Sequence, residues 1–221
     1  MGSSHEAGEG GKRGTEGSGT MEPSDWAIKC FGAHAGQLTR AVPQRLRNAH
    51  VRALAGHAAS RLKRNAKYGQ ILAEAALEEL AEEAESLGGE VRLLGGRPYA
   101  IIADHALFPY RYANRKVPLQ KARFRSGVSE RRKRLYNAHG PDGWSAGTLF
   151  DVEGEQLETE AYLRLREAFE ELGSQTRLVS VFFTSDTQDG IHQIHWGEAR
   201  LEIDRTFQWE RHEELPPAVE A

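Results

Sequence analysis

The spacing of apolar residues predicts two long amphipathic helices in the first half of the chain. Over residues 37–65 and again over residues 68–87, apolar side chains recur every three or four positions. Glutamates cover the opposite face of the second segment, and Gly88 follows it as a residue that readily ends a helix. Pro43 suits only a first turn, so the first helix is expected to begin near Val42.

After Gly88 the pattern changes to short apolar runs separated by turn residues, which is typical of strands. The predicted strands are residues 90–94, 98–104, 106–112, 148–152, 177–184 and 191–203, the first two forming a hairpin around Gly95-Gly96. The further predicted helices are residues 129–139 and 157–172, and a βαβ unit around the latter is one option. We therefore predict an α+β fold: two N-terminal helices, then a mainly antiparallel sheet of about five or six strands with two further helices.

Composition sets the expected domain limits. Residues 1–24 are mostly Gly, Ser and Glu and cannot bury enough apolar surface to order themselves, so a disordered tail is expected. Residues 206–221 contain Pro216-Pro217 and are expected to be a loose C-terminal tail. The remaining residues, 25–205, are predicted to form a single globular domain.

Two general features narrow the setting. Cys30 is the only cysteine, so no intramolecular disulfide can form, which favours a reducing, cytoplasmic location. No apolar run approaches the length of a membrane span, so no membrane partner is expected. The oligomeric state stays open.

Charge is strongly segregated along the chain although the net charge is only −3. Residues 26–73 carry nine Lys and Arg and no acid, residues 74–90 carry seven Glu and no base, and residues 111–134 carry ten Lys and Arg against Glu130 alone. This distribution predicts two basic segments, residues 40–67 and 111–134, that bind nucleic acid or another polyanion.

The second basic segment is the more specific of the two because aromatic residues are interleaved with its arginines. Tyr110, Tyr112 and Phe124 are candidate stacking groups for exposed bases. The candidate phosphate-binding residues are Arg111, Arg115, Lys116, Lys121, Arg123, Arg125, Arg131, Arg132, Lys133 and Arg134. The last four follow one another around a single helical turn, so at most two of them face one surface.

The leading hypothesis is therefore a non-enzymatic protein that binds DNA or RNA. Two other interpretations stay open at this point. The basic segments can pair with the acidic helix of residues 74–90 or with an acidic protein partner, and the chain can be a protein-interaction subunit without catalysis.

An enzyme acting on a phosphate-bearing substrate is the remaining alternative, with Asp104, His105, His139 and Glu198 as candidate catalytic residues. Asp104 ends an apolar strand, which is where a metal-dependent nuclease of the PD-(D/E)xK kind places its first metal ligand. That pattern needs a Glu-x-Lys on the next strand, and residues 108–112 contain no carboxylate. The histidine spacings also fail to predict a metal site, and no motif predicts a cofactor.

Overall fold

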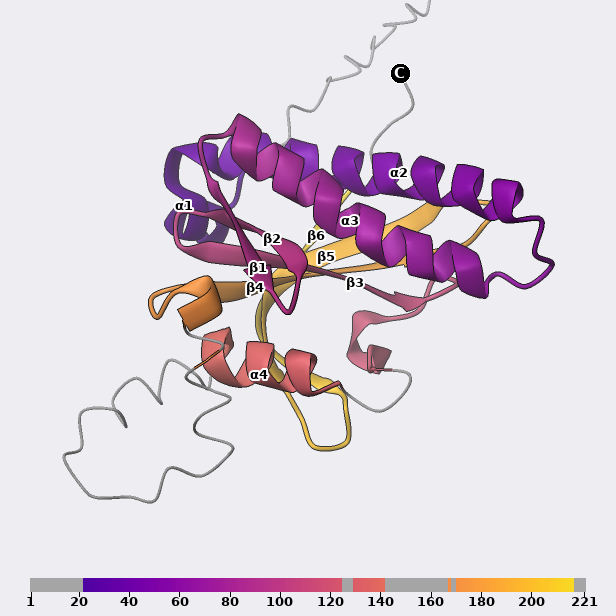
Figure 1. Ribbon diagram of the computed structural model, residues 1–221. Helices are drawn as coiled ribbons and strands as arrows, with labels where there is room; N and C mark the ends of the chain where they lie inside the picture. The colour runs from indigo at the N-terminus through magenta and orange to yellow at the C-terminus, as the bar shows by residue number, and fades with distance from the viewer. Residues whose placement is uncertain (1–21, 125–128, 142–166, 168–169, 217–221) are drawn as a thin grey trace, which may run out of the picture.

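The computed structural model describes residues 22–124, 129–141, 167 and 170–216 (Figure 1). Its centre is a six-stranded sheet in which the strands lie side by side in sequence order. Only β3 and β4 run parallel, and every other neighbouring pair is antiparallel. The strands are β1 (Glu90–Leu94), β2 (Arg97–Ile102), β3 (His105–Ala113), β4 (Arg177–Ser185), β5 (Ile191–Leu201) and β6 (Phe207–Leu215).

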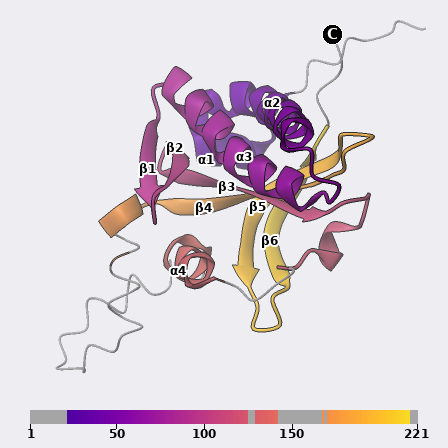
Figure 2. The same cartoon turned by 45° about the vertical axis from the view of Figure 1, so that its right-hand side comes forward.

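The helices cover the two faces of the sheet unequally. On one face lie α1 (Asp25–Phe31), the 3₁₀ turn η1 (Gly32–His34), α2 (Ala35–Ser60) and α3 (Ala66–Ser86), with α2 and α3 side by side. On the other face lies α4 (Glu130–His139), as the turned view in Figure 2 shows, and a second 3₁₀ turn, η2 (Leu119–Lys121), precedes it in the chain. The predicted α+β class is thus confirmed.

Three local predictions need correction. Helix α2 begins at Ala35 and continues through Pro43, because full burial of Leu38, Val42 and Leu46 outweighs the local cost of one missing backbone donor. The expected loose tail instead forms β6 over Phe207–Leu215, an edge strand whose charged outward side chains hide its pattern. Helix α1 is too short to show a period and was not predicted. The expected strand at residues 148–152 and most of the helix at residues 157–172 lie outside the described residues.

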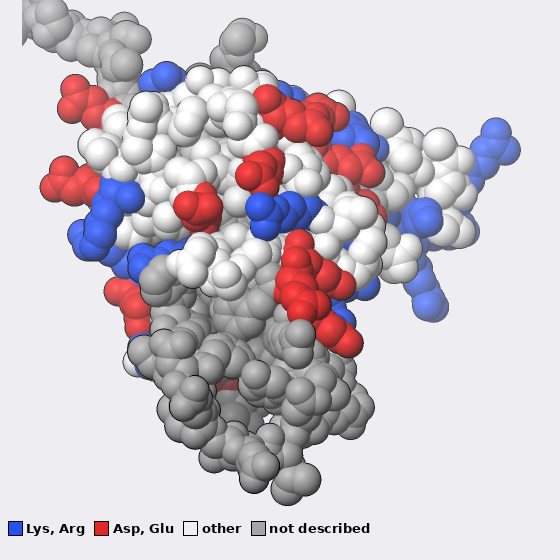
Figure 3. Space-filling view, turned by 60° about the vertical axis from the view of Figure 1, so that its left-hand side comes forward, with Lys and Arg blue, Asp and Glu red and all other residues white. Residues whose placement is uncertain are grey.

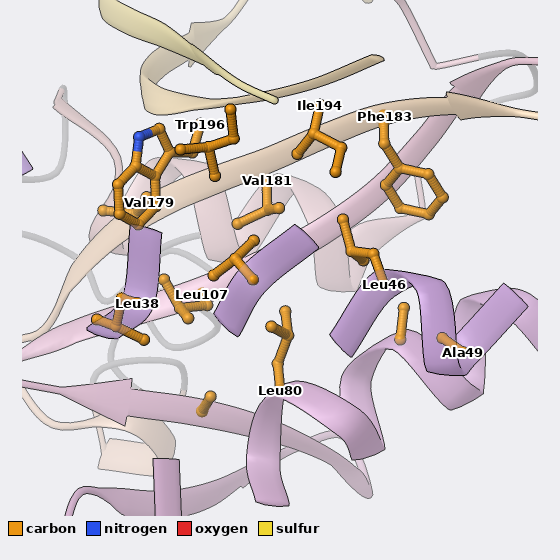
Figure 4. Packing of buried hydrophobic residues seen from close by; sticks show 14 of the residues in the cluster. Leu38, Leu46, Ala49, Leu80, Leu107, Val179, Val181, Phe183, Ile194 and Trp196 are labelled. Atoms are coloured by element: carbon orange, nitrogen blue, oxygen red, sulfur yellow. The ribbon is translucent and has the colours of Figure 1, made fainter. Parts of the chain in front are cut away.

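Two apolar cores lie on opposite faces of the sheet. Figure 4 shows Leu38 and Leu46 of α2 and Leu80 of α3 meeting Val181 of β4 and Trp196 of β5. The second core packs α4 and the segment after β3 against the other face, with Phe124, Leu135 and Phe182 completely buried. Because an apolar core packs against each face of the sheet, the positions of its strands are fixed.

Helices α2 and α3 are joined by a charge network on the side away from the sheet centre. Arg45 donates from Nε to Glu83 at 2.9 Å and from Nη1 to Glu79 at 3.3 Å, and both carboxylates are only 7% exposed. Arg52 also pairs with Glu79, at 3.2 Å. Burial alone would lower the pKa of Arg45, but its hydrogen bonds to Glu83 and Glu79 raise it. The first predicted basic segment is therefore partly neutralised within the fold.

We expect Arg45→Ala to lower the free energy of unfolding by about 2–3 kcal/mol, because it leaves the buried carboxylates of Glu79 and Glu83 without their main partner. Urea denaturation of the full chain measures this change. Arg40→Ala, on the exposed side of the same helix, is the matched control and should change stability by less than about 0.5 kcal/mol. Equal losses in the two variants would contradict a stabilising role for the network.

Candidate functional site

Strands β2 and β3 separate soon after the turn that joins them. Their ladder covers only two residue pairs, Ile101 with Ala106 and Ile102 with His105. Beyond these pairs β2 stays bonded to β1 and β3 stays bonded to β4. The sheet therefore contains an opening between two strands that are each held from the outer side.

Two prolines prevent the ladder from resuming further along the strands. If the register continued, Pro98 would lie opposite Pro109. Alternate pairs in an antiparallel ladder exchange both N–H···O bonds, and Ile102 with His105, flanking the two-residue turn, is such a pair. Hydrogen-bonded pairs recur at every second residue along each strand. Pro98 and Pro109 would occupy such a pair, but neither has a backbone N–H to donate. The N–H groups that the two prolines lack would have pointed into the gap. The bonds of β2 to β1 and of β3 to β4 are therefore unaffected.

The opening is the entrance to a cavity of about 490 Å³, which we call the notch. Its floor is aromatic: the rings of Tyr99 and Phe108 stack with centroids 6.3 Å apart, and Phe108 and Tyr110 stack at 6.4 Å. Helix α3 borders it with the small residues Gly69, Ala73 and Ala76, which leave space where larger side chains would fill it. The notch is thus a concave site; Tyr99 and Phe108 are buried beneath it, and Tyr110 is the half-buried ring of the three.

Four arginines surround this cavity: Arg97 from β2, Arg111 from β3, and Arg131 and Arg132 from the first turn of α4. Arg111 is fixed by donating from Nε and Nη2 to the carbonyl oxygen of Ser185, at 2.8 and 2.6 Å. Arg97 is paired with Glu74. In contrast, neither Arg131 nor Arg132 has a carboxylate partner among the described residues.

The two α4 arginines are held by contacts that leave their charge available. Arg132 lies over the rings of Phe124 and Tyr110, at 4.7 and 5.2 Å from their centroids. Arg131 rests against the β1–β2 turn, where a Cβ on Gly95 would come within 2.7 Å of its Nε. Gly95 also has φ +57°, so both its backbone and its neighbour favour glycine.

The pKa of the Tyr99 hydroxyl reflects the charges around the notch. Burial raises its pKa, and the charges of Arg131, Arg97 and Arg132 oppose that rise. Three arginines from two separate elements therefore act on a single atom at the floor. Glu74 is the acidic group that acts on it in the opposite direction. The described part of the notch is positive in sum.

The predicted stacking residues differ in their accessibility. Phe124 is completely buried in the core below α4, and Tyr112 is buried with its hydroxyl donating to the carbonyl oxygen of Val117 at 2.8 Å. Neither ring can stack on a base without unfolding its surroundings. Tyr110 is half-buried and lines the notch, so it alone of the three is placed to touch a ligand.

The predicted phosphate-binding residues are spread over more than one surface. The exposed ones outside the notch are Arg115, Lys116, Lys121, Arg123 and Lys133. Arg134 is turned toward Glu167, with which it pairs at 3.0 Å. Arg125 lies outside the described residues. The structure therefore brings together Arg111, Arg131 and Arg132 around one cavity and leaves the other described ones on the surrounding surface.

Arg97 and Tyr99 belong to this site but were not among the residues that the sequence predicted. Neither lies in a basic segment, and it is the placement of α4 beside the β1–β2 turn that brings them to Arg131. The two prolines, Pro98 and Pro109, could have indicated the opening from the sequence, because a proline inside a predicted strand indicates an unpaired edge.

The four candidate catalytic residues are distributed around the start of β4. His139 and Glu198 line one cavity of about 210 Å³ together with Arg177. His105 is buried on the other face of the sheet against Phe31, and burial lowers its pKa. Asp104 is exposed in the β2–β3 turn with φ +59°. Asp104 therefore serves as a turn residue, and no three His, Cys, Asp or Glu side chains in the described residues are placed to share a metal ion.

No family model, curated protein or solved structure matches this chain. Within the residues that the structure describes, no helix is both long enough and apolar enough to cross a membrane.

Replacing both prolines should close the ladder. In Pro98→Val/Pro109→Val each new amide can donate across the gap, so we expect the amides of residues 98 and 109 to exchange with solvent at least about tenfold more slowly than an unprotected amide. Hydrogen exchange followed by NMR measures this directly. Pro118→Val, in the exposed segment after β3, adds an amide without a ladder partner and is the control. If residues 98 and 109 exchange as fast as residue 118, the prolines are not what holds the strands apart.

Proposed function

We propose that this protein binds nucleic acid or another polyanion, with the notch as the centre of the binding surface. The observation that carries the proposal is the meeting of four arginines around one cavity, two of which lack a carboxylate partner among the described residues. A guanidinium group can donate two parallel hydrogen bonds to the oxygens of one phosphate. Its binding releases the counterions that had neutralised the phosphate. A cation that the fold does not neutralise has its full charge available for this purpose.

The exposed basic residues after β3 extend the surface beyond the notch. Arg115, Lys116, Lys121 and Arg123 are exposed on the segment between β3 and α4, whose first turn carries Arg131 and Arg132. A chain of phosphates lying along this segment would reach several of them in succession. On the face shown in Figure 3, by contrast, acidic and basic side chains are interspersed. The proposal is therefore confined to the region of the notch.

The first basic segment contributes less than its sequence suggests. Arg45 and Arg52 are occupied by the glutamates of α3, so the pairing alternative applies to them. A polyanion competing for Arg45 would leave Glu79 and Glu83 buried and unpaired, which is unfavourable. Arg45 and Arg52 are accordingly left out of the proposed surface.

Neither alternative function is favoured by a specific observation. The hydrolase interpretation depends on Asp104, which is exposed in a turn and does not line the cavity shared by His139 and Glu198. The interaction-subunit interpretation depends on an apolar patch, but the exposed large apolar side chains come from five separate places in the chain: Ile28, Val51, Leu62, Leu93 and Ile203. The cytoplasmic location stays a prediction from the single cysteine.

Fluorescence anisotropy with labelled single- and double-stranded DNA and RNA tests the proposal. We expect binding at ~50 mM salt that weakens by at least about tenfold at ~200 mM, because several phosphate contacts release counterions. Arg131→Glu/Arg132→Glu should weaken binding to all sequences alike and reduce the salt dependence.

The charge-matched control is Lys29→Glu/Arg211→Glu, which reverses two exposed charges on α1 and β6, away from the notch. It should lose much less affinity than the notch variant. Absence of binding at ~50 mM salt would overturn the proposal. Equal losses in the two variants would show that net charge, and not the notch, is responsible.

A further inference from the structure

The notch combines positive charge with a flat aromatic floor, and the combination selects the chemistry of its occupant. We infer that the notch binds a single nucleotide, either free or as an unstacked residue of a single strand, an inference that rests on the proposed function and specifies it. An inorganic phosphate would use the arginines and leave the accessible part of Tyr110 uncovered. A purely apolar ligand would bury Arg131 and Arg132 without partners. A nucleotide has both a phosphate and a planar ring.

The size of the cavity agrees with this class of ligand. At about 490 Å³ it lies within the range of pockets that enclose small organic ligands, roughly 300–1,000 Å³. The space exists because α3 presents Gly69, Ala73 and Ala76 to it, and because β2 and β3 do not pair there. Larger side chains on α3, or a complete ladder between β2 and β3, would each have filled this space.

The positions of the groups assign the two halves of the ligand. Arg132 holds its planar guanidinium over Phe124 and Tyr110, and such a plane is a surface on which a base can stack. Tyr110, half-buried beside it, provides a second flat surface. Arg131 lines the same cavity from α4 without a carboxylate partner among the described residues, so it is placed to receive the phosphate, and Arg97, which pairs with Glu74, lies beside it.

A duplex cannot place a base in the notch without unpairing it, so the inference separates single strands from duplexes. Both contact the surrounding cations through phosphates, but only an unpaired nucleotide can place its base against Tyr110 and the Arg132 guanidinium. Filling the notch with an uncharged side chain should therefore weaken single-strand binding and leave duplex binding unchanged.

Ala73→Leu provides that change, because Ala73 is exposed on α3 and borders the notch, and leucine is a good helix former. Ala55→Leu, an exposed alanine of α2 that does not line the notch, is the matched control. The full chain carrying each substitution is titrated with AMP, with inorganic phosphate, with a labelled single strand of thymidylates, with the same strand containing abasic residues, and with a duplex. Thermal melts establish that both variants are folded.

We expect AMP to bind the unmodified protein at least about tenfold more tightly than inorganic phosphate, and the intact strand to bind at least about tenfold more tightly than the abasic strand of equal charge. Ala73→Leu should abolish both differences, and Ala55→Leu should keep them. Discrimination against abasic residues identifies a nucleotide within a strand as the occupant, and AMP binding without strand binding identifies a free nucleotide.

The outcomes distinguish this inference from the proposed function. If strands bind with the expected salt dependence but AMP equals phosphate and Ala73→Leu has no effect, the polyanion proposal stands and the nucleotide inference is overturned. If AMP binds in the notch and no strand binds, the inference stands and the polyanion proposal fails. If no probe binds, both are wrong.

Discussion

The missing pair of hydrogen bonds between Pro98 and Pro109 determines the shape of this protein's candidate site. A hairpin normally closes along its whole length because every second pair satisfies two donors. Here the turn at Ala103-Asp104 keeps the strands together at one end, while the two prolines remove both donors of one later pair. Since β1 and β4 hold the strands from outside, the opening does not disrupt the sheet. A gap with firm walls results, into which α4 can direct its arginines.

Internal pairing decides which of the many cations remain available. The chain has 29 Lys and Arg against 32 Asp and Glu, so most positive charges can find a partner somewhere. Arg45 and Arg52 of α2 find theirs on α3, where burial of Glu79 and Glu83 makes the pairing costly to break. Arg131 and Arg132 instead contact a glycine turn and two aromatic rings. Among the described residues neither has a carboxylate partner, and this distinguishes them from Arg45 and Arg52 of α2.

Local patterns predicted the elements better than they predicted the site. The period of the helix at residues 68–87 and the Gly95-Gly96 turn are local features, and both correspond to what the structure shows. Burial is not local: Phe124 and Tyr110 are both aromatic residues beside arginines, yet one is completely buried and the other lines the notch. Arg97 joins the site because α4 lies beside the β1–β2 turn, a contact between residues far apart in the sequence. The site could be predicted as a basic aromatic segment but not as a cavity.

The walls of the notch differ in rigidity, and this difference bears on how it would bind. Arg111 is fixed by the carbonyl oxygen of Ser185, whose hydroxyl contacts Tyr68, and Tyr68 contacts Nδ1 of His50 at 2.9 Å. This chain of hydrogen bonds ties one wall to α2 and α3, so Arg111 loses little freedom when a ligand arrives. Arg131 lies at the start of a ten-residue helix and rests against a glycine turn. A ligand would therefore meet Arg111, which is preorganised, and Arg131, which can adjust its position. Affinity would then depend mainly on how well Arg131 can be positioned.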